Sequence, residues 1–219
     1  HPSNVFRPID ISEDAIRDIT TKMKSWIPYL KTEGICGDYF QMLEGLKGSG
    51  RKLILFLGSN LGNMLDNQAK VFLKSLDKAM NSGDQLLLGL DLIKPKEIVL
   101  PAYKDEKGIT SAFNMNLLER MNSELGADFA IEKFEHVAEY ETEEGIARSF
   151  IQSNEEQSVF VEELDCTIDF KQGEKIQTEV SRKYNEEILR GLLENTSLKI
   201  QELFTDEKEY FTDFLILKE

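Results

Sequence analysis

Residues 52–63 read KLILFLGSNLGN, and residues 85–91 read QLLLGLD. Both contain short apolar runs with the length of buried strands, and the first run leads into a loop rich in Gly, Ser and Asn. Between them, apolar side chains recur at helical spacing, at Ala69, Phe72, Leu73, Leu76, Ala79 and Met80. This strand–helix–strand order predicts a doubly wound α/β sheet. The unbroken apolar run predicts that the strand at residues 52–57 is covered on both faces.

Upstream of this unit, two short extended stretches each end in an acid. Residues 5–10 end at Asp10, and residues 31–38 end at Asp38. Either acid alone would more simply be a helix cap or a solvated turn residue. In a doubly wound sheet, however, ligands bind beyond the carboxyl ends of the strands, where an acid accepts the ribose hydroxyls of nucleotide-type cofactors. Together with the loop at residues 58–63, the two acids therefore predict a cofactor site.

Downstream, the alternation of strands and helices breaks. Residues 94–181 predict a helix from Thr110 to Leu125, followed by strands near residues 135–142, 147–152, 158–161, 167–170 and 176–179. This order is typical of an inserted α+β region with its own antiparallel sheet. A helix near residues 185–194 and strands near 198–205 and 210–217 then restore the α/β pattern. We therefore expect a Rossmann-like core of residues 1–93 and 182–219, with residues 94–181 inserted into it.

The composition narrows the class of protein. The 219 residues are enough for one sizeable domain. The net charge is −14, from 40 acidic and 26 basic side chains, and it repels phosphate backbones and anionic lipid surfaces. We expect neither a nucleic-acid nor a membrane partner. Cys36 and Cys166 have no metal-ligand spacing, and neither His1 nor His136 predicts a metal or catalytic site. Because neither a leader nor a membrane-spanning run is evident, we expect a cytoplasmic location.

Six ordered motifs resemble those of one family. They read PIDIS at 8–12, GDY at 37–39, FLGSNLGN at 56–63, FNMN at 113–116, ELGADF at 124–129 and QTEVS at 177–181. Together they make essentially the whole chain similar to the S-adenosylmethionine-dependent histidine-specific (histidine Nα-) methyltransferases, known from ergothioneine biosynthesis. The resemblance implies a Rossmann-like class I methyltransferase sheet, an inserted substrate-recognition region and S-adenosyl-L-methionine as the cofactor. It also implies N-methylation of the α-amino group of a small amino acid, with histidine favoured.

The resemblance further implies roles for individual residues. The cofactor-binding residues would be Asp10 at the ribose, Asp38 and Tyr39 at the adenine, and Ser59. The substrate-binding residues would be the Gly58 carbonyl and the Asn63 amide at the amino and carboxylate ends, Tyr103 at the carboxylate, and Glu179 with Ser181 at the imidazole ring. We assign neither a metal nor a catalytic side chain, because positioning and charge placement do most of the work in methyl transfer to an amine.

The chain also departs from the family pattern. The glycine-rich first cofactor loop and the N-terminal substrate segment of the family are missing, so we expect a sheet incomplete at its N-terminal side and a chain that is inactive alone. Its exposed edge would permit self-association. Where the family places an apolar residue against the substrate ring, this chain has Arg148 or Ser149. Two alternatives therefore stay open: a methyltransferase for another amino acid or small amine, and a non-catalytic partner protein with this fold.

Overall fold

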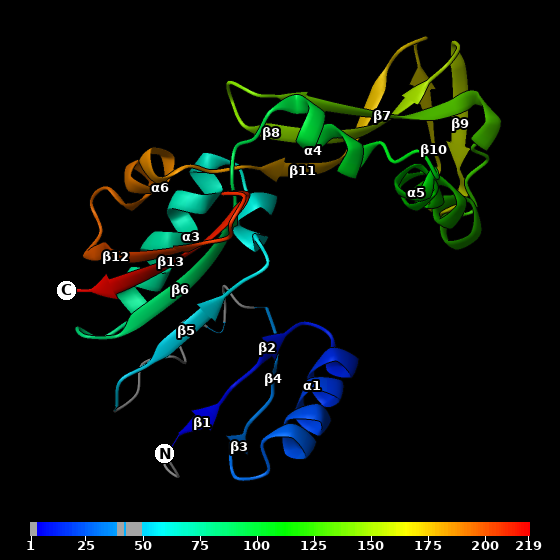
Figure 1. Cartoon of the computed structure of the whole chain (residues 1–219). Coiled ribbons are helices and arrows are strands. Elements are labelled where there is room, and N and C mark those ends of the chain that lie inside the picture. Colours follow the sequence, from blue (N-terminus) through cyan, green and yellow to red (C-terminus); the bar gives the residue numbers. More distant parts are fainter. Residues whose placement is uncertain (1–3, 39–41, 43–49) are drawn as a thin grey trace.

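A four-stranded sheet forms the centre of the protein. The computed structural model describes residues 4–38, 42 and 50–219. The strand order is β12-β13-β6-β5, where the strands are β5 (Leu53–Phe56), β6 (Gln85–Asp91), β12 (Leu198–Thr205) and β13 (Phe211–Lys218). β5 and β6 are parallel, whereas β13 is antiparallel to both of its neighbours (Figure 1). The predicted α/β class is confirmed, and the sheet itself is mixed rather than fully parallel.

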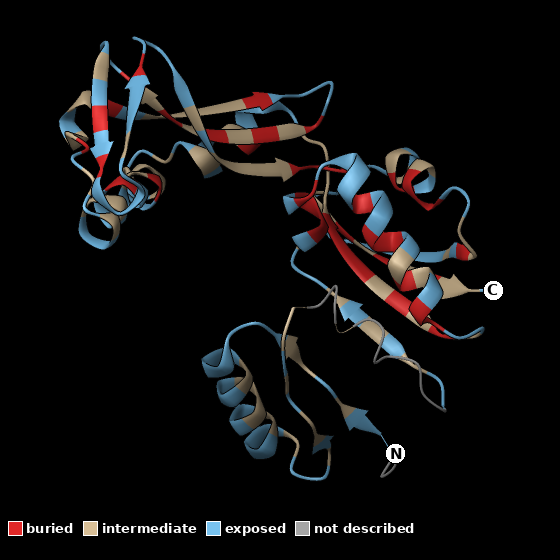
Figure 2. Cartoon of the chain, turned by 180° about the vertical axis from the view of Figure 1, so that it is seen from behind, coloured by how far each residue is buried: buried red, intermediate tan, exposed pale blue. Residues whose placement is uncertain are grey.

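Two helices cover one face of this sheet. They are α3 (Asp66–Ala79) and α6 (Glu186–Leu193). Every second residue of β6, Leu86, Leu88 and Leu90, is fully buried. These leucines belong to one core cluster with the helical stripe of α3 and with residues of β13 and α6 (Figure 2). The predicted stripe on α3 is therefore the side of the helix that builds the core.

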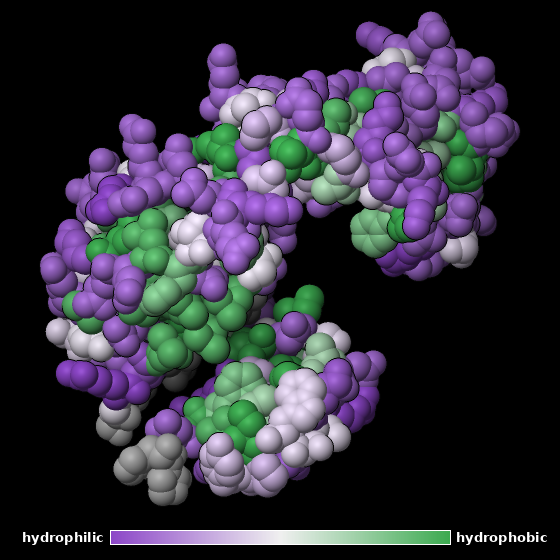
Figure 3. All heavy atoms as spheres, viewed as in Figure 1, coloured by the Kyte–Doolittle hydropathy of each residue, from purple (hydrophilic) through white to green (hydrophobic). Residues whose placement is uncertain are grey.

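The opposite face of the sheet carries exposed apolar side chains. Leu53, Leu55 and Leu57 have exposed fractions of 57%, 49% and 41%. Ile54 and Phe56 alternate with these leucines and pack against the core. The prediction that residues 52–57 are covered on both faces is therefore wrong. In the described part of the chain, α3 and α6 pack on one side of the sheet, and Figure 3 shows a broad apolar surface on the other side.

An N-terminal β–α–β unit forms separate parallel strand pairs. β1 (Val5–Phe6) pairs with β3 (Lys31–Thr32), and β2 (Ile9–Asp10) pairs with β4 (Ile35–Cys36). Helix α1 (Glu13–Trp26) connects the pairs. Ser12 precedes the helix and caps it, because its hydroxyl accepts a hydrogen bond from the amide of Ala15. Among the described residues, no strand pairing joins this unit to the outer edge of β5. In the described part of the chain, this edge of β5 is therefore unpaired.

The inserted region has its own antiparallel sheet, in the order β11-β8-β7. Its elements are α4 (Lys96–Tyr103), α5 (Ile109–Leu125), the 3₁₀ helix η3 (Ile131–Lys133), β7 (Phe134–Glu141), β8 (Ile146–Ser153), β9 (Gln157–Val161), the 3₁₀ helix η4 (Glu162–Leu164), β10 (Cys166–Phe170) and β11 (Lys175–Arg182). Leu118 of α5 packs with Phe134, Ile151 and Phe170 in a second core. The strand β11 leads from this sheet back into the central unit (Figure 1). No helix in the described ranges is long and apolar enough to cross a bilayer.

Candidate functional site

The loop after β5 is hydrogen-bonded to the end of β6. Gly58 and Ser59 both adopt left-handed backbone conformations, with φ of +74° and +57°, and the 3₁₀ helix η2 (Asn60–Asn63) follows. The Ser59 amide donates to the Gly89 carbonyl at 3.1 Å, and the Ser59 hydroxyl accepts from the Asp91 amide at 3.0 Å. Ser59, predicted at the cofactor, therefore also joins the carboxyl ends of two neighbouring strands. A glycine at position 58 permits the left-handed turn without steric cost.

Gly62 permits the close approach of η2 to β11. A Cβ atom at residue 62 would lie 2.8 Å from the backbone oxygen of Arg182. We expect Gly62→Ala to lower the free energy of unfolding by about 2 kcal/mol, because this contact forces the backbone apart. Urea denaturation measures the change, and Gly191→Ala in α6 is the matched control, since a Cβ there meets no atom within 4 Å. Equal stability of Gly62→Ala and wild type would contradict the expected clash.

One pocket brings together two predicted substrate residues. Asn63 of η2 and Glu179 of β11 line a pocket of about 560 Å³ with residues of α5. The other residues that line it are Phe113, Asn114, Asn116, Leu117, Arg120, Thr178 and Val180. The FNMN motif at 113–116 points to this wall, but sequence reasoning assigned no role to its residues. The pocket therefore joins the loop after β5 to the inserted region.

The carboxylate of Glu179 has a partner on β8. The Ser149 hydroxyl donates to Oε2 of Glu179 at 3.4 Å, and Ser149 is fully buried. Arg148 instead pairs with Glu141, at 3.2 Å, and with Glu144. Because neighbouring residues of a strand point to opposite faces, Ser149 rather than Arg148 is the residue beside Glu179.

The charge of Glu179 acts on the pKa of His136, which lies on β7. Burial lowers the pKa of His136, and the negative charge of Glu179 opposes this shift only in part. The Nε2 atom of His136 is buried without a hydrogen-bond partner among the described residues. The imidazole is therefore neutral at pH 7.

A buried lysine joins two further predicted residues. Lys183 is only 4% exposed, and its Nζ donates to the Tyr103 hydroxyl at 2.7 Å and to the Ser181 hydroxyl at 2.9 Å. It also forms an ion pair with Oδ2 of Asp91 at 2.9 Å. Burial alone would lower the pKa of Lys183, but the hydrogen bonds to Tyr103 and Asp91 outweigh it and raise that pKa. Lys183 is therefore a cation at neutral pH.

Sequence reasoning missed Lys183 and Asp91. Lys183 lies two residues beyond the QTEVS motif, and Asp91 ends β6, so the only signal was their position beside recognised segments. A second lysine, Lys94, also bonds to the carboxylate of Asp91. Because Lys183 is a donor to the Tyr103 oxygen, the phenolic hydrogen of Tyr103 stays available to an acceptor such as a carboxylate.

The predicted cofactor acids lie at adjacent strand ends. The Gly37 amide donates to the Asp10 carbonyl at 2.9 Å, which sets Asp10 beside the segment that leads to Asp38. Asp10 is exposed, and its Oδ1 accepts from the Ser12 amide at 2.8 Å. β2, β4 and β5 run in the same direction, so their carboxyl ends face the same side of the molecule (Figure 1). The pocket that Asn63 lines includes neither acid, and Tyr39 lies outside the described residues.

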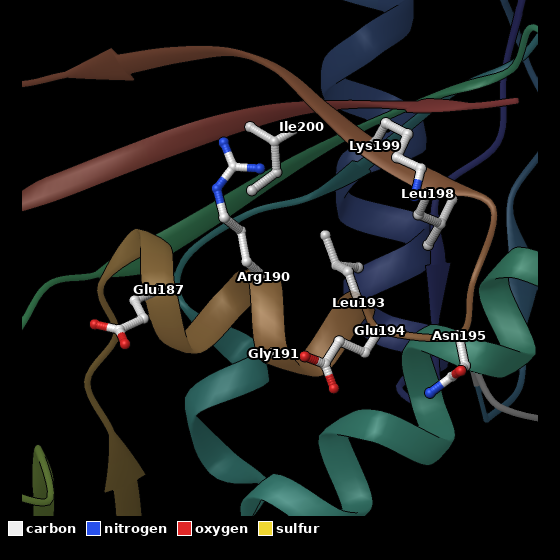
Figure 4. A pocket seen from close by; sticks show the side chains of 9 residues that line it. All are labelled: Glu187, Arg190, Gly191, Leu193, Glu194, Asn195, Leu198, Lys199 and Ile200. Carbon is white, nitrogen blue, oxygen red and sulfur yellow. The ribbon is translucent and has the colours of Figure 1, made fainter.

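A separate pocket of about 660 Å³ lies between α6 and β12 (Figure 4). Leu193, Leu198 and Ile200 supply its apolar lining, with charged side chains such as Arg190 and Glu194 around them. None of the predicted site residues lines this pocket. Among residues 4–38, 42 and 50–219, no group of three or more His, Cys, Asp or Glu side chains could hold a metal ion.

The chain is similar in sequence to one protein family and to several of its known members. Residues 2–218 match the family described as histidine-specific, SAM-dependent methyltransferase. The histidine N-alpha-methyltransferase of Mycolicibacterium smegmatis is 35% identical over 201 residues, which cover 92% of this chain and 63% of that protein. Ergothioneine biosynthesis protein 1 of Schizosaccharomyces pombe is 26% identical over 222 residues, covering 98% of this chain and 28% of that protein. The chain therefore spans less than two thirds of the length of these curated relatives.

Solved structures show the same fold. The CcbJ methyltransferase of Streptomyces caelestis superposes with a TM-score of 0.52 at 11% identity, covering 97% of this chain and 79% of that chain. At this identity the likeness concerns the fold alone. It supports the class I methyltransferase sheet expected from the sequence.

Proposed function

The chain belongs to the histidine-specific, SAM-dependent methyltransferases, and from this premise we propose that the protein methylates the α-amino nitrogen of a free amino acid, histidine. The observation that carries the proposal is the pocket shared by Asn63 and Glu179. An amide and a carboxylate there match the two ends of such a substrate: a charged amino-acid head and a ring N–H. As part of the same proposal, residues 94–181 recognise the substrate and the rest of the chain forms the cofactor-binding core.

The residues present fit the cofactor. Asp10 is exposed at a strand end with one carboxylate oxygen engaged by the Ser12 amide, so the other oxygen is available to a ribose hydroxyl. Asp38, beyond the adjacent strand β4, would lie at the adenine, with Tyr39 beside it, and Ser59 completes the set at the end of β5. When bound, S-adenosyl-L-methionine supplies a methyl group made electrophilic by its sulfonium charge.

The chain's own residues would hold the amino acid in place for in-line transfer. The Gly58 carbonyl and the Asn63 amide hold the amino and carboxylate ends, and the Tyr103 hydroxyl donates to the carboxylate while Lys183 holds its oxygen. Glu179 accepts the imidazole N–H, with Ser181 close by on the same strand. These contacts keep the neutral amine lone pair aimed at the methyl carbon, and positioning of this kind lowers the barrier without a strong base.

The test is an amino-acid panel offered to the full-length gene product with S-adenosyl-L-methionine. Mass spectrometry of the products should show histidine gaining methyl groups. Methylation of another amino acid while histidine stays unmodified would replace histidine as the substrate, an alternative that the polar Ser149 beside Glu179 keeps open. A full-length protein that fails to bind S-adenosylhomocysteine would favour a non-catalytic partner protein.

We expect the 219 residues by themselves to bind S-adenosylhomocysteine weakly and to turn over little. Asp10 and Asp38 lie on or beside strand pairs that no pairing in the described part of the chain joins to β5, so no backbone ladder there connects the two halves of the proposed cofactor site. Isothermal titration calorimetry compares this chain with the full-length gene product. Tight, stoichiometric binding by the 219 residues alone would contradict this expectation.

We also propose that the chain self-associates through the edge of β5 that has no strand partner among the described residues, a strand that exposes Leu53 and Leu55. Unpaired edges and exposed apolar strands invite pairing with another chain, and a lysine on the strand opposes it. Leu55→Lys should shift the 219-residue chain toward monomer in analytical ultracentrifugation. Val71→Lys, on the exposed surface of α3, is the matched control and should leave the distribution unchanged. Identical sedimentation of wild type and Leu55→Lys contradicts the proposal.

We place the protein in the cytoplasm as part of this proposal. Both cysteines are free thiols, which fits a reducing compartment. Cell fractionation of the full-length gene product with an antibody against it tests the location.

A further inference from the structure

The strand that carries Glu179 is interrupted by a β-bulge. On β11 the register with β8 steps from Gln177 opposite Phe150 to Glu179 opposite Ser149, so Thr178 is the extra residue. In a regular strand, residues 178 and 179 would point to opposite faces of the sheet. Here Thr178 and Glu179 both line the same pocket. Bulges of this kind re-aim side chains and recur next to active sites.

A buried amide on α5 holds the extra residue. The Thr178 hydroxyl donates to Oδ1 of Asn114 at 2.6 Å and lies 3.0 Å from the carbonyl oxygen of Ser149. Asn114 is 5% exposed, and its Nδ2 donates to the Thr110 carbonyl at 3.0 Å. That second bond turns Oδ1 of Asn114 toward Thr178. The bulge is therefore tied to α5 on one side and to β8 on the other.

The same residues lead directly to Glu179. Ser149, whose carbonyl oxygen contacts Thr178, donates its hydroxyl to the carboxylate of Glu179. We infer that Thr178 is a positioning residue: its hydroxyl fixes the bulge, and the bulge fixes the carboxylate that reads a hydrogen-bond donor on the substrate ring. This inference rests on the proposed function, and it assigns to Thr178 a role in substrate specificity rather than in the transfer step.

The expected effect is confined to substrate binding. Without the hydroxyl, Asn114 Oδ1 loses its donor and the Ser149 carbonyl loses its contact with that hydroxyl, and Glu179 samples more than one orientation. A carboxylate that is loosely held binds a ring N–H less well, but the amine and the methyl donor still meet through the residues at the other end of the substrate. The KM for histidine should therefore rise while kcat stays nearly constant.

The experiment compares Thr178→Val with Thr178→Ser in the full-length gene product. We expect Thr178→Val to raise the KM of histidine, and its Kd in the presence of S-adenosylhomocysteine, by about 10-fold, with kcat within about 2-fold of wild type. Thr178→Ser keeps the hydroxyl and should restore both constants. The preference for histidine over β-(2-thienyl)alanine, whose five-membered ring has no N–H, should fall by the same factor in Thr178→Val.

Three results overturn the inference. They are an unchanged KM in Thr178→Val, a loss confined to kcat, or a failure of Thr178→Ser to restore binding. Should Thr178→Val fail to fold, Asn114→Leu removes the same hydrogen bond from the side of α5 and must give the same rise in KM. If wild type leaves histidine unmodified, the proposed function fails. The variants are then measured on the amino acid that the panel identifies, where a KM equal to wild type overturns the inference as well.

Discussion

Replacing Glu179 by alanine is expected to lower kcat/KM for histidine by about 100-fold in the full-length protein. A hydrogen bond to a charged group contributes about 1.5–3 kcal/mol, and a value near the upper end of that range corresponds to a 100-fold change in kcat/KM. Glu179 lines the pocket beside Asn63, and its carboxylate is held by Ser149. Glu179→Gln keeps one acceptor oxygen and should lose only about 10-fold. Steady-state kinetics with a fixed, saturating concentration of methyl donor measure both variants.

A control variant distinguishes the loss of the carboxylate in the pocket from a general change in the net charge of the protein. Glu163, in η4, is exposed and outside the pocket, so Glu163→Gln makes the same change of charge without touching the proposed site. Its kcat/KM should equal that of wild type. If Glu179→Ala keeps wild-type activity toward histidine, Glu179 does not read the substrate ring, and the assignment taken from the family resemblance fails for this chain.

Replacing Lys183 by methionine is expected to lower the free energy of unfolding by about 3 kcal/mol. Removing one partner of a buried ion pair leaves the other charge without compensation. Here Asp91 would keep Lys94 as its one cationic partner among the described residues, and Tyr103 and Ser181 would lose the donor that they share. Guanidinium denaturation measures the loss. Lys199→Met, on the exposed part of β12, is the control and should leave the midpoint unchanged.

The pH dependence gives an independent check on Lys183. Its pKa is raised in the folded protein above the ordinary lysine value of 10.5, so the ion pair contributes its full stability below that value. The contribution is lost only as the pH rises further, through the raised pKa. The difference in stability between wild type and Lys183→Met should therefore be constant from pH 7 to about pH 10 and shrink above it. A difference that already disappears at pH 8 would contradict the assignment of Lys183 as the cation of this cluster.

Elements with strong local periodicity were predicted closely. The helix expected over residues 110–125 is α5, and the strand expected over residues 198–205 is β12. Both signals lie within the segment itself, in the spacing of apolar side chains. Helix α4 was not predicted, because it has only eight residues and Pro101 lies inside it. The continuous stretch expected at residues 5–10 is split into β1 and β2 around Pro8, which has no N–H for a strand ladder.

Features that depend on contacts between neighbouring elements were predicted wrongly or were not predicted. An apolar run indicates a strand that could be buried on both faces, but Leu55 is exposed because burial depends on what packs against it. The choice between Arg148 and Ser149 depended on the register of β8 against β11, which no local pattern encodes. For the same reason the bulge at Thr178 was invisible until the two strands were paired.

Most of the order of strands and helices, the family and the acids at two strand ends follow from the amino-acid sequence, because each is carried by short motifs and periodicities within single segments. The folded chain alone shows that Lys183 gathers Tyr103, Ser181 and Asp91, and that Asn114 holds Thr178 beside Glu179. These contacts join segments that are far apart in sequence. They depend on strand register, on a one-residue bulge and on how helices pack across a sheet, and such relations arise only when separate segments meet in space.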